Sequence, residues 1–91
     1  MTEKEPYGLI LAPGARRALT DLLPEAAACA AWEFISGPLV AAPRRVGAPL
    51  RTPFEGHWCA RRGEYRIRYE IREATHTVPI LDIDHRRDAY H

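Results

Sequence analysis

The sequence lacks the features of membrane, secreted and disulfide-stabilised proteins. Its longest unbroken apolar run, Ala26 to Trp32, is far shorter than the roughly 20 residues that span a bilayer. The mixed charges of residues 1–5 lead into no apolar segment, so we expect no secretory signal. These two absences predict a soluble, cytoplasmic protein without a membrane partner.

Cysteine is scarce, and the two that occur, Cys29 and Cys59, form no CxxC pair. This excludes a disulfide scaffold and a cysteine zinc framework. His57 and Cys59 have no third and fourth ligand at metal-binding spacing, so we expect no metal ion and no cofactor. Residues 1–91 are the length of one domain, which packing alone has to stabilise.

Lysine is almost absent, because twelve of the thirteen basic residues are arginine and Lys4 is the only lysine. Residues 1–43 carry three basic and five acidic side chains, whereas residues 44–91 carry ten basic and seven acidic ones. Arginine binds phosphate oxygens two at a time and stacks on bases, which is typical of nucleic-acid-binding proteins. A row of arginines is also typical of the solvated face of a sheet, and both interpretations stay open at this point.

The first half of the chain predicts a strand and two helices. The apolar run over residues 7–12 is typical of a strand. Apolar residues at helical spacing predict a helix over residues 15–22, and Pro24 separates it from an alanine-rich helix that starts at Glu25. Gly37-Pro38 is expected to end the second helix. The two helices then form an antiparallel hairpin.

The second half predicts a sheet. Four prolines between residues 38 and 53 predict a connecting loop, after which the hydrophobic period changes from 3.6 to 2. Strands are expected over residues 54–61, 65–71 and 76–84, with turns at Arg62-Gly63 and residues 73–75. Pro79 requires either an exposed edge or a bulge in the last strand.

These elements predict the α+β class. An N-terminal strand and an antiparallel helix hairpin precede a three-stranded antiparallel meander, and the helices cover one face of a mostly antiparallel sheet. The other face carries the arginines. Trp32, Trp58 and Phe34 are expected in the core.

Residues able to act on a phosphodiester gather on the face opposite the helices. Arg66 and Arg68 alternate with apolar residues, so they share one face of their strand. If the preceding strand pairs with it, His57, Cys59 and Arg61 lie on the same face. Attack by a ribose 2′-hydroxyl needs a base, an acid and positive charge at the phosphorane; arginine suits the last task and histidine the proton transfers.

The second half of the chain resembles the RelE/ParE superfamily of bacterial toxins, specifically its RelE branch. The resemblance is carried by blocks in the family's order and spacing: Gly37-Pro38-Leu39, residues 43–51, Glu55-Gly56, residues 60–69 and residues 85–90. Its most specific parts are Gly63-Glu64-Tyr65-Arg66 and the terminal His85-Arg86-Arg87-Asp88-Ala89-Tyr90.

The resemblance implies a toxin of a type II toxin–antitoxin pair. Such a toxin enters the ribosomal A site and cleaves mRNA by 2′-hydroxyl attack, leaving a 2′,3′-cyclic phosphate and a 5′-hydroxyl. The implied partners are a cognate antitoxin, RelB-like or of another small family, the ribosome and mRNA. Operator DNA would be bound only through the antitoxin complex.

The resemblance also implies roles for individual residues. Arg66 matches the strand arginine taken to hold the scissile phosphate, and Arg86 matches the arginine of the terminal element, with a similar charge role. Arg61 matches another basic position of the site. Tyr90 matches the terminal tyrosine, which orients or stacks on the substrate.

The sequence departs from the family pattern at His57 and Cys59, where some ribosome-dependent members carry lysines. The family's proton-transfer scheme therefore does not carry over intact. Because other superfamily members use a histidine or a carboxylate, we take His57 or His85 as the expected base.

Two other functions stay open beside the nuclease. A ParE-like toxin would inhibit DNA gyrase without nuclease activity, and a catalytically inactive relative would only bind an antitoxin. The presence of Arg66, Arg86 and Tyr90 together favours the nuclease, because a gyrase inhibitor does not need a phosphate-cleaving set.

Overall fold

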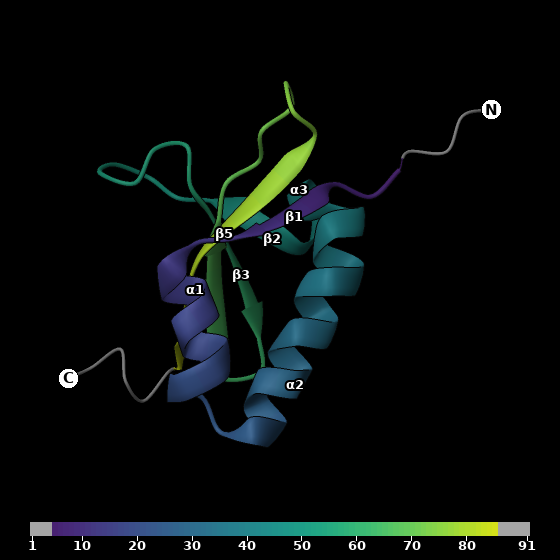
Figure 1. The fold of residues 1–91 in the computed structure, drawn as a ribbon. Coiled ribbons are helices and arrows are strands. Elements are labelled where there is room, and N and C mark those ends of the chain that lie inside the picture. Colours follow the sequence, from purple (N-terminus) through teal and green to yellow (C-terminus); the bar gives the residue numbers. More distant parts are fainter. Residues whose placement is uncertain (1–4, 86–91) are drawn as a thin grey trace.

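The computed structural model describes residues 5–85, and Figure 1 shows their fold. A five-stranded sheet of order β1-β5-β4-β3-β2 carries helices on one face. The strands are β1 (Gly8–Leu11), β2 (Gly47–Pro49), β3 (Trp58–Arg62), β4 (Tyr65–Tyr69) and β5 (Thr77–His85). The helical segments are α1 (Pro13–Arg17), η1 (Ala18–Leu22), α2 (Glu25–Phe34), η2 (Ile35–Leu39) and α3 (Pro43–Val46), where η denotes a wider, π-helical turn. The predicted α+β class is confirmed.

The predicted helix hairpin is also confirmed. α1 begins at Pro13, whose fixed φ suits a first helical turn, and continues directly into η1. Pro24 stands at the N-cap of the alanine-rich α2. Figure 1 shows α1 and α2 running in opposite directions in front of the sheet.

The prediction that Gly37-Pro38 ends the second helix is wrong. The backbone stays helical through η2, with Pro38 inside it. Gly37 does not adopt the left-handed backbone of a C-cap glycine. The wider π-helical turn accommodates the missing N–H of Pro38, and its carbonyl accepts the N–H of Ala42 at 3.0 Å.

The proline-rich segment holds more regular structure than predicted. α3 and the short β2 both lie within the expected loop, and β2 pairs antiparallel with β3. The predicted strand is wrong over residues 54–57, because Gly56 has a φ of 89° that a pleated strand does not accommodate. The following turn lies one residue later than predicted, at Gly63-Glu64, since Arg62 already pairs with Tyr65.

The meander β3-β4-β5 is antiparallel, as predicted. β1 joins the free edge of β5 and runs parallel to it, with Gly8 opposite Thr77 and Leu11 opposite Ile80. β5 is therefore an inner strand, and Pro79 is not at an exposed edge.

The core lies between the helices and the sheet. The largest side chains that are fully buried there are those of Ile35, Leu39, Ile67, Tyr69, Val78 and Ile80. Phe34 is buried and Trp58 packs partly against the core, as expected. Trp32 is 43% exposed, so its expected core position is wrong. It faces outward because α2 presents its small residues Ala27 and Ala31 to the sheet.

An irregularity in β5 resolves the conflict at Pro79. Ile80 lies opposite Tyr69 and Asp82 lies opposite Arg68, so the register shifts by one residue at Leu81. The carbonyl of Pro79 still accepts the N–H of Glu70 at 3.0 Å. A one-residue shift moves the following side chains to the other face. Ile83 therefore follows Ile80 into the core, although the two are three positions apart.

Candidate functional site

The face of β3–β5 opposite the helices, here termed the arginine face, carries Arg61 and Arg66 of the predicted site. Cross-strand pairing defines two rows on it. One row joins Arg61 on β3, Arg66 on β4 and Asp84 on β5. The neighbouring row joins Cys59, Arg68 and Asp82. The buried Ile67 and Tyr69 alternate with the two β4 arginines, which confirms that the arginines point away from the core.

Arg61 and Arg66 form a positive pair across two neighbouring strands. They lie directly opposite each other on adjacent strands. Among residues 5–85, neither side chain makes an ion pair or a hydrogen bond. Like charges directly opposite each other destabilise a sheet. An anion that bridges the two guanidinium groups would remove that cost, so this pair is suited to a phosphate.

Arg68 is held more firmly than its neighbours. Its Nη2 lies 3.9 Å from Oδ2 of Asp82, and its guanidinium carbon lies 5.5 Å from the centre of the Phe54 ring. Its buried Nε has no hydrogen-bond partner. Phe54 itself is 44% exposed, so an aromatic side chain borders the arginine face at this end.

His57 lies at the same end, away from the Arg61–Arg66 pair. Its Nε2 is 3.6 Å from Oε2 of Glu70, and its buried Nδ1 has no partner. His57 lies four positions before Arg61, a separation of roughly 13 Å along an extended strand. The structure therefore brings Arg61 and Arg66 together but does not place His57 beside them.

The remaining predicted site residues belong to the end of the chain. β5 ends at His85, whose backbone lies opposite Tyr65. Arg86 and Tyr90 lie outside the described residues. The expected meeting of Arg66 with Arg86 is therefore a prediction that the described residues do not address.

Sequence reasoning missed Asp82 and Asp84. Strict alternation from Val78 and Ile80 would have placed both aspartates in the core, and the shift at Leu81 turns them onto the arginine face instead. A signal was present in the sequence, because the apolar positions change from even to odd numbers between Ile80 and Ile83. Burial raises the pKa of the Asp84 carboxyl, and so does the nearby Asp82.

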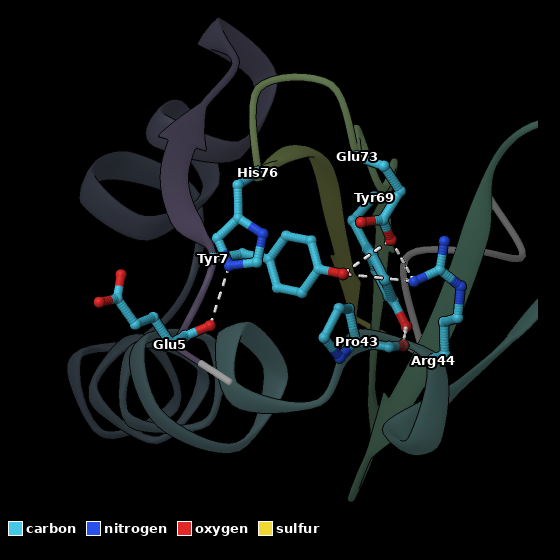
Figure 2. A network of polar contacts seen from close by, with 7 residues as sticks. All are labelled: Glu5, Tyr7, Pro43, Arg44, Tyr69, Glu73 and His76. Carbon is cyan, nitrogen blue, oxygen red and sulfur yellow. Dashed lines mark hydrogen bonds and ion pairs between the residues drawn. The ribbon is translucent and has the colours of Figure 1, made fainter. Parts of the chain in front are cut away.

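A second polar network supports the sheet away from the arginine face (Figure 2). Arg44 forms an ion pair with Glu73, and the Tyr7 hydroxyl donates to Glu73 at 2.7 Å. The ring of Tyr7 stacks on His76 at 4.0 Å. Tyr7 thus ties the segment before β1 to α3 and to the turn before β5. The hydrogen bonds from Tyr7 and Arg44 lower the pKa of the Glu73 carboxyl.

Tyr69 connects this scaffold to the core. Its hydroxyl donates to the carbonyl of Pro43 at 2.6 Å (Figure 2). Burial raises its pKa to about 12. The hydroxyl of Tyr69 therefore keeps its proton near neutral pH, where it serves as a hydrogen-bond donor within the fold and not in proton transfer.

Among residues 5–85, no three histidine, cysteine or acidic side chains are grouped so that they could hold a metal ion. Both cysteines are free. In the same range, no helix has the length and apolar character needed to cross a membrane.

Comparison with known proteins identifies the family. Residues 9–90 match the family described as the ParE toxin of type II toxin–antitoxin systems. Toxin RelE of Mycobacterium tuberculosis (strain ATCC 25618 / H37Rv) is 42% identical over 90 residues, which are 99% of this chain and 92% of that protein. Toxin RelG of the same organism is 46% identical over 85 residues, which are 93% of this chain and 97% of that protein.

Solved structures agree with this assignment. A chain of the toxin–antitoxin complex RelBE2 from Mycobacterium tuberculosis is 44% identical and superposes with a TM-score of 0.85, covering 90% of this chain and 100% of that one. A chain of the archaeal RelE–RelB complex from Pyrococcus horikoshii OT3, at 23% identity, shares the fold with a TM-score of 0.66 over 90% of this chain and 97% of that one. The relatives of high identity carry the RelE and RelG names, which favours the RelE-like branch over the ParE-like one. The chain therefore belongs to the RelE/ParE family of type II toxin–antitoxin toxins and to its RelE-like branch.

Proposed function

We propose that this chain is a metal-independent endoribonuclease that cleaves mRNA on the ribosome and thereby inhibits translation. The observation that carries this proposal is the Arg61–Arg66 pair on the sheet face opposite the helices, where neither arginine has an ion-pair partner among residues 5–85. The similarity to toxins named RelE and RelG supports it. A gyrase inhibitor has no need for two arginines that lie opposite each other on adjacent strands.

In this mechanism Arg66 holds the scissile phosphate and Arg61 neutralises its second non-bridging oxygen. Charge grows on these oxygens when the ribose 2′-oxygen attacks the phosphorus. Positive groups placed in advance stabilise that charge more than they stabilise the ground state. We expect Arg86 and Tyr90 to complete the site, Arg86 as a further cation and Tyr90 by orienting the nucleotide. The ribosome supplies the positioning of the mRNA.

The proposal is tested with programmed ribosomes. Arg61→Ala and Arg66→Ala should each lower the rate of A-site mRNA cleavage by about 10²- to 10³-fold, the usual effect of removing one transition-state contact. Arg62→Ala is the matched control, because Arg62 lies next to Arg61 on β3 but contacts the ring of Phe34 instead. It should cleave at the wild-type rate.

The same assay separates the alternatives. A 2′-deoxynucleotide at the cleaved position should abolish cleavage, because it removes the nucleophile. If Arg66→Ala cleaves as fast as the wild type, the proposal is wrong. A protein that leaves mRNA intact and inhibits gyrase supercoiling would be ParE-like, and one that does neither would be an inactive antitoxin-binding relative.

We further propose a RelB-like antitoxin as the protein partner, with operator DNA bound only through that complex. The relative of known structure occurs in a toxin–antitoxin complex. An open apolar hollow of about 510 Å³ lies between α1, η1 and α2 and includes the exposed Trp32, as expected of a surface that another chain covers. Co-expression with a RelB-like antitoxin should restore growth and yield a stable complex; toxicity that persists would exclude that partner.

A further inference from the structure

The irregularity at Leu81 places a carboxylate beside the phosphate-binding arginines. Asp84 lies opposite Arg66 on the neighbouring strand, and Arg61 lies on the other side of Arg66. The three side chains form one row across β3, β4 and β5. Bulges are common next to active sites, where they redirect a side chain, and here the shift turns Asp84 out of the core.

Asp84 is exposed, and its carboxyl lies within hydrogen-bonding reach of Asp82. Among the described residues it forms no ion pair within 4 Å, although Arg66 is its cross-strand neighbour. The charged groups that face it are Asp82 on its own strand and Arg66 and Arg68 on β4. Arg68 is already paired with Asp82. Asp84 therefore lies beside Arg66 without forming an ion pair with it, so its carboxylate is able to accept a proton from a substrate.

The expected base His57 is less well placed. It lies beyond the Arg68–Asp82 row, and its Nε2 faces Glu70 at 3.6 Å. A phosphate held between Arg61 and Arg66 would be adjacent to Asp84 and roughly 13 Å from His57 along the strand. A general base has to reach the proton directly or through one water molecule.

We propose that Asp84 is the general base of this enzyme. The inference rests on the proposed function. Asp84 accepts the proton of the 2′-hydroxyl while the 2′-oxygen forms a bond to phosphorus. The bond from phosphorus to the 5′-oxygen breaks, and the 5′-oxygen leaves with the electron pair and takes a proton from a water molecule. The hydroxide so formed returns Asp84 to its carboxylate, and the products are a 2′,3′-cyclic phosphate and a 5′-hydroxyl.

Asp82 acts as a positioning residue. Its Oδ1 accepts the N–H of Ile83 at 2.9 Å, and its Oδ2 faces Arg68. It thereby keeps Arg68 from pairing with Asp84. Its negative charge also raises the pKa of the Asp84 carboxyl. A base whose pKa lies closer to neutrality removes a hydroxyl proton more effectively.

The test measures single-turnover cleavage and ribosome binding separately. Asp84→Asn preserves size and polarity but cannot accept the proton. We expect its cleavage rate to fall by about 10²- to 10⁴-fold, the usual range for a general base. Binding should be unchanged or tighter, because a negative charge beside the phosphate is lost. Asp21→Asn removes the same charge from the exposed end of η1 and should behave as the wild type.

The pH profile gives a second measurement that a structural role would not change. The wild-type rate should fall on the acid side as one carboxyl takes up its proton, and Asp84→Asn should lose this dependence. Asp84→Glu keeps the carboxylate and should recover part of the rate. If circular dichroism shows that Asp84→Asn does not fold, the pH profile of the wild-type protein is the test. A wild-type cleavage rate that does not fall at acid pH would overturn the assignment of Asp84 as the base.

Failure of this inference is distinguishable from failure of the proposed function. If the wild type does not cleave mRNA, the proposed function is wrong. If the wild type cleaves and Asp84→Asn cleaves equally fast, the nuclease stands and Asp84 is not its base. A loss of cleavage in His57→Ala together with full activity in Asp84→Asn would return that role to His57.

Discussion

Within residues 5–85, the hydroxyl of Tyr69 makes one hydrogen bond, and the side chain is fully buried. Its hydroxyl donates to the Pro43 carbonyl, and its ring lies in the core between the helices and the sheet. Removing the hydroxyl leaves the carbonyl of Pro43 without its partner. We therefore expect Tyr69→Phe to lower the free energy of unfolding by about 1–3 kcal/mol at neutral pH, measured by urea denaturation.

The same residue predicts a loss of stability at alkaline pH. In the unfolded chain the phenol loses its proton near its ordinary pKa of 10, whereas the folded protein keeps that proton up to about 12. The folded state binds more protons in this window, so the free energy of unfolding should fall as the pH rises from 10 to 12. Tyr69→Phe should show a shallower fall. Equal slopes in both proteins would contradict the assignment.

At the scale of the element, β2 can approach β3 closely because residue 47 is a glycine and has no side chain. A Cβ on Gly47 would collide with the Tyr69 hydroxyl and would lie 2.8 Å from the carbonyl oxygen of Cys59. Because one of these atoms belongs to the backbone, the strand itself would have to move. Gly47→Ala should therefore be destabilising by about 1–3 kcal/mol, as overpacked sites are, in thermal or urea unfolding.

Gly37 is the matched control for this substitution. A Cβ there would meet nothing within 4 Å, and the residue is helical. Gly37→Ala should leave stability unchanged or raise it by about 0.4–1 kcal/mol, because alanine restricts the unfolded chain. If both alanine variants lose the same stability, close packing at Gly47 is not the cause.

The elements differ in how far the sequence predicts them. The alternation over β4 and the alanine-rich α2 follow from local periodicity, and both were predicted. η2 was not, because the usual rule for Gly37 and Pro38 assumes an α-helical turn and not a wider one. β2 and the edge taken by β1 depend on pairing partners far along the chain, which local patterns do not encode.

The candidate site, like the fold, was predicted from the sequence only in part. Period-2 alternation places Arg66 on the face opposite the helices, and Arg61 joins it if the two strands pair, which the structure confirms. Asp84 was missed because one extra residue at Leu81 changes the face of every later side chain. The expectation for Arg86 and Tyr90 rests on family resemblance and stays a prediction.

At the scale of the whole molecule, three arginines stand together on one face of the sheet. The three arginines of the arginine face stand on two adjacent strands. Association with the ribosome should then weaken as salt rises, since each phosphate contact releases counterions. The double variant Arg61→Gln, Arg66→Gln should reduce the slope of log affinity against log salt by about 2. Arg16→Gln and Arg17→Gln on α1 provide a control of equal charge; a control that reduces the slope as much would show that only net charge matters.

The parallel pairing of β1 with β5 also governs when the protein becomes active during its own synthesis. Gly8 pairs with Thr77, so β1 has no partner strand until β5 has been synthesised. The row of Arg61, Arg66 and Asp84 is likewise complete only when β5 has formed. A nascent chain that ends before β5 lacks this strand of the sheet, and it also lacks Asp82 and Asp84, which lie opposite the β4 arginines. If the target is a translating ribosome, as proposed, we expect no mRNA cleavage by a nascent chain that has not yet added β5.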